Sequence, residues 1–254
     1  MQTSKTESYI DEHRLFWFRI NRPEKRNAID YDVMNDLEHA LGEAQANPLV
    51  RAFIITGAGE QSFCSGGDLS VFHSLYTKED AYAMLSRMGA ILFKLMTLPL
   101  PTYALINGTA IGGGCEIASA CDQRWAMPHA RMGFVQGDLG ITTGWGGASM
   151  LFEKVPSPQA LQMLNSANIY TAVEAERLGF IQKVLEKSEV GSMVVESLVE
   201  SSAVLRSYKQ ALITKWEQTN LKERMLAEIE QCAYLWEQDE HHMAVARFLQ
   251  SKKK

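Results

Sequence analysis

The sequence predicts an α/β fold that is followed by a helical C-terminal region. Through about residue 125, short apolar segments, glycine-rich turns and amphipathic segments repeat in that order. The segments 52–56 and 103–106 are almost wholly apolar, which is typical of parallel strands buried on both faces. From about residue 188, glycine nearly disappears and apolar residues recur at helical spacing. We therefore expect an α/β core at 1–187 and a helical region at 188–254.

The first elements show how the remaining ones are assigned. A strand at 14–20 is followed by a polar loop at 21–27. Asp30 is then a candidate N-cap, because its side chain can accept hydrogen bonds from first-turn N–H groups, and Pro48 stops the helix that follows. The same signals predict strands at 52–56, 103–106, 123–127, 131–134 and 180–185, a loop at 62–69, a helix at 79–96 and a helix that starts near Cys115.

Composition excludes several classes of protein. Hydrophobic residues make up 46% of the 254 residues, which is enough for a core and excludes wholesale disorder. The 25 basic and 30 acidic residues give a net charge of −5, and general nucleic-acid binding needs a large basic surface instead. A single small anionic ligand is still compatible with this balance, because a few local cations can hold it.

The cysteines and the N-terminus indicate an intracellular setting. The four cysteines show no C-x-x-C spacing and have no histidine pair at zinc spacing, so we expect reduced thiols and no metal site. The N-terminus is polar, and charges or prolines interrupt the longest apolar run. We expect a cytoplasmic protein with no membrane contact.

Two glycine clusters carry the chemical signal. Gly66-Gly67 and Gly112–Gly114 are each predicted to lie between a strand and a helix, and each is followed by an acid, Asp68 or Glu116. Two such junctions side by side can direct two backbone N–H groups at one oxygen, which makes an oxyanion hole. Tight turns alone are the competing explanation. No dinucleotide fingerprint, P-loop or nucleophile elbow is present.

Three motifs in order resemble the crotonase (enoyl-CoA hydratase/isomerase) superfamily. They are INRPEKRNA at 20–28, FCSGGDL at 63–69 and INGTAIGGGCE at 106–116. The resemblance implies a crotonase-like spiral of ββα units with a C-terminal helical trimerisation region, assembled as a homotrimer or a dimer of trimers. It also implies an acyl-CoA substrate, in which coenzyme A is part of the substrate and no separate cofactor is needed.

The same resemblance assigns roles to individual residues. The amides of Gly67 and Gly113 would hold the thioester oxygen, and Ser65 and Gly66 would line the adenine and pantetheine path. The loop from Arg22 to Ala28 would lie near the phosphates and ribose. The implied binding residues are Arg22, Lys25, Arg26, Ala28, Ser65, Gly66, Asp68 and Leu69.

The residues at the two acid positions of the superfamily distinguish between the possible reactions. Hydratases of this superfamily use two glutamates; the first matches Glu116, but the second position holds Gln136. An amide can hydrogen-bond but cannot transfer a proton near neutral pH, so efficient hydration and isomerisation are doubtful. Asp138 is a possible substitute acid.

We therefore favour decarboxylation of a malonyl-type CoA, which forms an enolate without a base. Three segments, 63–69, 134–136 and 144–147, are similar to the branch that contains ethylmalonyl-CoA decarboxylase. A core aromatic at a tight turn is the competing explanation for Trp145. A genuine enoyl-CoA hydratase or isomerase of fatty-acid metabolism is the alternative, and a catalytically silent CoA-binding protein is the alternative of another class.

The helical region predicts an oligomer. Its apolar faces exceed what a helical appendix is expected to bury alone. These faces carry Leu205, Leu212, Leu221, Met225 and Ile229. The resemblance also makes Phe248 and Lys252 candidates for closing the site of a neighbouring subunit.

Overall fold

Two β-sheets form the core of the computed structural model, which describes residues 4–185 and 190–251. Five strands of the larger sheet run parallel, and β1 at its edge is antiparallel to β2. In spatial order this sheet contains β1 (Thr6–Ile10), β2 (Leu15–Ile20), β3 (Ala52–Gly57), β5 (Thr102–Ile106), β7 (Gln123–Ala126) and β10 (Lys183–Val184). The smaller sheet contains β4 (Ser62–Cys64), β6 (Thr109–Ile111), β8 (Arg131–Gly133) and β9 (Tyr170–Thr171).

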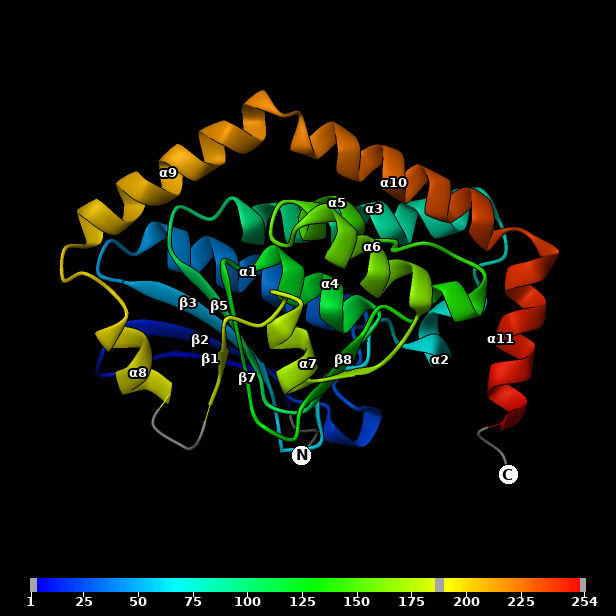
Figure 1. Ribbon diagram of the computed structural model, residues 1–254, viewed down its shortest axis with the longest axis horizontal. Coiled ribbons are helices and arrows are strands. Elements are labelled where there is room, and N and C mark those ends of the chain that lie inside the picture. The colour runs from blue at the N-terminus through cyan, green and yellow to red at the C-terminus, as the bar shows by residue number, and fades with distance from the viewer. Residues whose placement is uncertain (1–3, 186–189, 252–254) are drawn as a thin grey trace.

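Helices cover the sheets, and the last three form an outer arm. In Figure 1, α9 and α10 run as an arch past α3 and α5, and α11 turns down one side. The helices of the core are α1 (Tyr31–Ala46), α2 (Leu69–Phe72), α3 (Lys78–Met96), α4 (Gly113–Ala120), α5 (Gly147–Phe152), α6 (Ser157–Ser166) and α7 (Ala172–Arg177), with 3-10 turns η1 (Pro23–Lys25) and η2 (Gln136–Leu139). The helices after them are α8 (Val190–Glu196), α9 (Ser202–Gln218), α10 (Leu221–Trp236) and α11 (Asp239–Ser251).

The predicted α/β class and the long elements are confirmed. Asp30 caps α1, where its side chain accepts hydrogen bonds from the N–H groups of Asp32 and Val33. Every residue of β3 is buried, as its apolar run predicts. The helix predicted at 79–96 is α3, which begins at Lys78 after a Thr77 N-cap.

Short elements differ from the prediction. The predicted loop at 62–69 begins with β4, and β6 lies between the strand at 103–106 and the second glycine cluster. The strand predicted at 180–185 covers only Lys183–Val184, and α4 begins at Gly113 rather than near Cys115. Strands of two or three residues are too short to show a periodic pattern in the sequence. They form because they pair with neighbouring strands in the folded chain.

The argument for an oligomer from the apolar faces was wrong. Leu221, Met225 and Ile229 are 1–2% exposed, and they pack into the core of their own chain. The side chains that remain exposed on α9 and α10 include Tyr208 and Tyr234. The oligomer itself stays a prediction. The boundary predicted between 187 and 188 and the candidate Lys252 lie outside the described residues. Across residues 4–185 and 190–251, no helix has the length and apolarity needed to cross a membrane.

A buried ion pair fastens α9 to the core. The Nζ atom of Lys209 lies 2.6 Å from both carboxylate oxygens of Asp122, and Lys154 is a second cation, with its Nζ 3.4 Å from Asp122 Oδ1. Burial acts to raise the pKa of Asp122, but the charges of Lys209 and Lys154 outweigh it and hold this pKa below its usual value.

Removing this pair is expected to loosen α9. Lys209→Ala should cost about 3–5 kcal/mol of unfolding free energy, because it leaves a buried carboxylate without its nearest partner. Lys215→Ala on the same helix is the control: its ion pair with Glu153 is exposed on the lysine side and should be worth about 1 kcal/mol or less. Urea unfolding measures both. Equal costs for the two variants would contradict the anchoring role.

Candidate active site

Two glycine-rich loops meet at the carboxyl ends of β4 and β6. These strands are parallel, with Cys64 opposite Ala110, so the loops that follow them emerge at the same edge. A Cβ built on Gly66, whose φ is +88°, would lie 3.1 Å from the amide nitrogen of Gly113, so only glycine fits there. The N–H groups of Gly67 and Gly113 donate to no atom of the described residues. Two unpaired N–H groups on touching loops are available to a ligand oxygen, as an oxyanion hole needs.

The two segments that were predicted to bind the CoA portion are hydrogen-bonded to each other. Ser65 donates its backbone N–H to the carbonyl of Arg26 at 3.1 Å. Ile29 donates to the Gly66 carbonyl at 2.9 Å, and Asp68 donates to the Ile29 carbonyl at 2.8 Å. The loop 22–28 therefore lies directly beside the loop 65–69.

Arg22 has a structural role that sequence reasoning missed. Its guanidinium is buried, with Nη2 2.7 Å from Asp68 Oδ2 and Nη1 2.7 Å from the Ala28 carbonyl and 3.3 Å from Asp30 Oδ2. Two carboxylates thus neutralise Arg22 and leave it unsuited to a phosphate. Asp68 is likewise committed, as the partner of Arg22 and the N-cap of α2.

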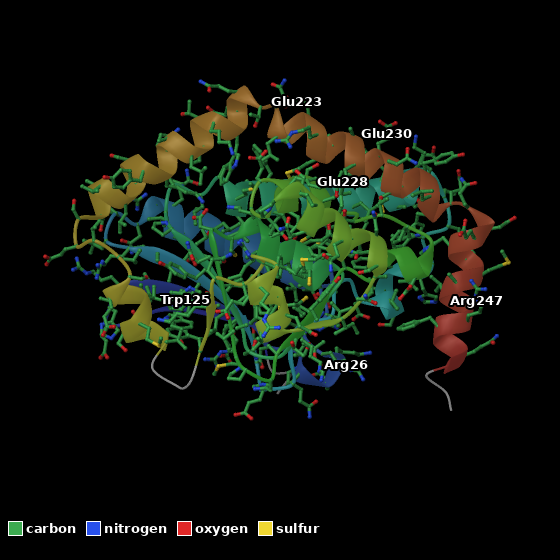
Figure 2. All side chains as sticks on the ribbon, in the orientation of Figure 1. Arg26, Trp125, Glu223, Glu228, Glu230 and Arg247 are labelled. Atoms are coloured by element: carbon green, nitrogen blue, oxygen red, sulfur yellow. The ribbon has the colours of Figure 1, made fainter. Side chains whose placement is uncertain are left out.

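Four other predicted binding residues are at least partly exposed to solvent. Lys25 and Arg26 are exposed, and their side chains make no hydrogen bond or ion pair within the described part of the chain. Arg26 lies at the edge of the molecule away from α10 in Figure 2. Ser65 and Leu69 are half-buried. These two cations are therefore the groups on the loop that can meet an anion.

The carboxylate of Glu116 is fully hydrogen-bonded. Oε2 accepts the N–H groups of Trp145 at 2.8 Å and Gly147 at 2.9 Å. Oε1 accepts the Gln136 side-chain amide at 2.9 Å and the Gly144 N–H at 3.3 Å. Glu116 is 2% exposed and lies one helical turn after Gly113 on α4, so the structure brings it to the oxyanion loops.

Glu116 titrates near neutrality. Burial, together with the negative charge of Glu228, raises the pKa of Glu116 to about 7, against the N–H groups of Trp145, Gly144 and Gly147, which lower it. A carboxyl group with this pKa is able both to hold and to release a proton at physiological pH. This property suits a general acid.

Gln136 touches Glu116 directly. The 2.9 Å separation of Gln136 Nε2 and Glu116 Oε1 leaves no space for a water molecule between them. Gln136 Oε1 is buried and has no partner among the described residues. If the amide turns over, Oε1 can accept a hydrogen bond from protonated Glu116, so the pair tolerates both protonation states. Asp138 is exposed and makes no hydrogen bond to Glu116, so the two acids do not form a pair in this structure.

The Trp145 indole borders both glycine loops. Its benzene edge would lie 2.2 Å from a Cβ on Gly113 and 3.8 Å from one on Gly67, so the ring borders both oxyanion residues. Its backbone N–H holds Glu116, as described above. Trp145 is 4% exposed. The residue that resembled a core aromatic is therefore also part of the site wall.

Glu228 of α10 is the site residue that sequence reasoning missed. Its carboxylate accepts the N–H groups of Ala148 at 2.9 Å and Ser149 at 2.8 Å. A signal was available: Glu228 stands at helical spacing from the apolar positions 221, 225 and 232, where a carboxylate needs a buried partner.

Comparison with known proteins places this architecture in a family. The enoyl-CoA hydratase/isomerase family model matches residues 12–254. The chain is 32% identical to a short-chain-enoyl-CoA hydratase of Clostridium acetobutylicum over 92% of this chain and 90% of that protein. It is 36% identical to a crotonyl-CoA hydratase of Syntrophomonas wolfei over 70% of this chain and 68% of that protein. It is 32% identical to an ethylmalonyl-CoA decarboxylase of Xenopus laevis over 85% of this chain and 74% of that protein.

Solved structures share the fold. An enoyl-CoA hydratase structure from Bacillus halodurans superposes with a TM-score of 0.87, at 24% identity, over 96% of this chain and 100% of that one. The family model spans most of the sequence, and the structural likeness covers both the sheets and the C-terminal helices. The chain therefore belongs to the enoyl-CoA hydratase/isomerase family of enzymes.

Proposed function

We propose that this enzyme decarboxylates a short malonyl-type acyl-CoA and hydrates enoyl-CoA poorly. The observation that carries the proposal is the direct contact between Glu116 and Gln136. Hydration requires two proton-transfer groups with a water held between them, whereas this site offers one carboxyl group and no gap. Decarboxylation needs an oxyanion hole and one proton donor, and both are available here.

Each step of the proposed reaction uses one of the groups described above. Lys25 and Arg26 attract the phosphates of the CoA portion, and the N–H groups of Gly67 and Gly113 hold the thioester oxygen. The bond between Cα and the substrate carboxylate breaks; CO₂ leaves, and the bonding electron pair forms the enolate that the two amides stabilise. Protonated Glu116 then gives its proton to Cα, and solvent protonates Glu116 again. The product is the saturated acyl-CoA.

Gln136 supplies the contact for the departing group. Before CO₂ leaves, Glu116 is protonated, so the amide turns Oε1 toward Glu116 and both hydrogens on Nε2 are released from it. We expect one of these hydrogens to hold the substrate carboxylate. Because the amide is neutral, it orients this carboxylate without the repulsion that a second glutamate would impose.

Trp145 is expected to limit the acyl chain. Trp145→Phe should raise the preference for butylmalonyl-CoA over ethylmalonyl-CoA by about 10-fold, because a smaller ring frees space beside the oxyanion loops. Steady-state kcat/KM for the two substrates measures this. The control is Trp125→Phe, the same change at a buried site on β7 that is far from Glu228 in Figure 2. An unchanged preference in Trp145→Phe would contradict the wall role.

A panel of thioesters tests the proposal. We expect purified enzyme to release CO₂ from ethylmalonyl-CoA or methylmalonyl-CoA and to leave crotonyl-CoA nearly unchanged. Rapid hydration of crotonyl-CoA would favour the second candidate, a genuine hydratase, which the 36% identity to a crotonyl-CoA hydratase supports. Binding of CoA without turnover of any thioester would instead indicate a silent relative.

A further inference from the structure

The N-terminus of α5 is held by two carboxylates from two different helices. Its N-cap, Gly146, has no side chain, so the first-turn N–H groups need acceptors from elsewhere. Glu116 of α4 takes the Gly147 N–H, and Glu228 of α10 takes the next two, from Ala148 and Ser149. The segment 143–149 is therefore held between α4 of the core and α10.

Glu228 differs from its neighbours on α10 in direction. Figure 2 shows Glu228 on the inner side of α10, whereas Glu223 and Glu230 lie on the outer side. The hydroxyl of Thr143 also donates to Glu228 Oε1, and the Ala148 N–H is shared with Thr143 Oγ1 at 3.1 Å. Three donors from one segment thus converge on a single carboxylate.

We propose that Glu228 is a positioning residue of the active site: it holds segment 143–149, whose N–H groups hold Glu116, and it places a second negative charge beside Glu116. Through Glu228, helix α10 thereby helps to fix both the position and the pKa of Glu116. The kinetic part of this inference rests on the proposed function, whereas the titration of Glu116 can be observed without turnover.

The charge of Glu228 acts on Glu116 in a defined direction. Burial is the largest cause that raises the pKa of Glu116 to about 7, and the ionised form of Glu228 adds to it. Burial also raises the pKa of Glu228 itself, against the hydrogen bonds from Thr143, Ser149 and Ala148, which lower it. Burial, together with the negative charge of Glu116, raises the pKa of the thiols of Cys115 on α4 and Cys232 on α10, so both are neutral near pH 7. From η2, the neighbour of Glu116 is the neutral amide of Gln136.

The sign of the pH effect follows. If protonated Glu116 is the donor, activity is high below its pKa and falls as the pH rises through about 7. Removing the charge of Glu228 lowers this pKa, so the falling limb moves to lower pH. The free energy of unfolding of the wild-type enzyme should also fall with rising pH. A carboxyl group whose pKa is raised by folding makes a contribution that is present at low pH and is lost as the pH rises through about 7.

The test compares Glu228→Gln with Glu223→Gln, an identical change on the outer side of the same helix. In full-length enzyme labelled with ¹³C-glutamate, we expect the Glu116 titration midpoint to fall by about one pH unit in Glu228→Gln and to stay unchanged in Glu223→Gln. The falling limb of the kcat pH profile should move by the same amount. A Glu228→Gln variant that loses thermal stability while the Glu116 midpoint stays in place would overturn the proposal.

Glu228→Asp keeps the test decisive if Glu228→Gln does not fold. The aspartate keeps the charge, so the midpoint of Glu116 should stay near its wild-type value. Its shorter side chain cannot span both N–H groups, so kcat should fall while KM changes little; an unchanged kcat would count against positioning. If no thioester reacts but the midpoint still shifts in Glu228→Gln, the proposed function fails and this inference stands.

Discussion

Replacing Glu116 with Gln is expected to lower kcat for ethylmalonyl-CoA by about 10²–10⁴-fold. The amide keeps the volume of the side chain but has no proton to give to Cα. Binding of the thioester should change little, because the N–H groups of Gly67 and Gly113 do not depend on Glu116 for a partner. Steady-state kinetics measure kcat and KM, and a saturated acyl-CoA competitor measures affinity separately.

The matched control for this prediction is Asp138→Asn. Asp138 lies two residues after Gln136, yet it is exposed and does not contact Glu116. We expect Asp138→Asn to keep the wild-type kcat. The opposite result, in which Asp138→Asn is inactive and Glu116→Gln is active, would assign the proton to Asp138 and refute the site as described.

The second large effect is expected from Gln136→Glu. The new carboxylate would replace the amide that lies 2.9 Å from Glu116, and two carboxylates at this distance share one proton rather than ionise together. When both groups ionise, their repulsion should move them apart and admit the water that the wild-type contact excludes, so hydration of crotonyl-CoA should rise by about 10²–10⁴-fold. Decarboxylation should fall, because the substrate carboxylate would then face a negative charge.

Gln136→Met separates this gain from simple loosening of the site. Methionine has a similar length, but its thioether has no hydrogen to donate and cannot transfer a proton, so it should produce no hydratase activity. Assays that follow loss of the enoyl thioester from crotonyl-CoA compare the two variants. A folded Gln136→Glu enzyme whose hydration rate stays flat would show that residue 136 does not occupy the second acid position.

The fold was predictable where local signals are strong. The continuous apolar run of β3 and the Asp30 cap of α1 each predict their element without help from the rest of the chain. The short strands β4 and β6 were missed, because strands of three residues that are held by pairing with their neighbours carry no periodic signal. The burial of α10 was also missed: its apolar face was expected to meet another subunit, but it packs on its own core.

The part of the site that is built from backbone N–H groups was predictable, because glycine clusters mark the loops that form it. Two glycine clusters at strand–helix junctions indicated an oxyanion hole, and the resemblance to the crotonase superfamily assigned Gly67, Gly113 and Glu116 to the site; the structure brings these three residues together. Side-chain pairings over long sequence distances were not predictable. The two acids that neutralise Arg22, and the contact of Glu228 with α5, depend on how separate elements pack rather than on any local motif.

The central claim is that contact between one acid and one amide favours loss of CO₂ over addition of water. The most direct measurement is the ratio of kcat/KM for ethylmalonyl-CoA decarboxylation to kcat/KM for crotonyl-CoA hydration, taken on the same wild-type preparation in D₂O. We expect a ratio well above one, with one deuterium at Cα of the saturated acyl-CoA product. A ratio below one, with deuterated 3-hydroxyacyl-CoA as the main product, would contradict the account.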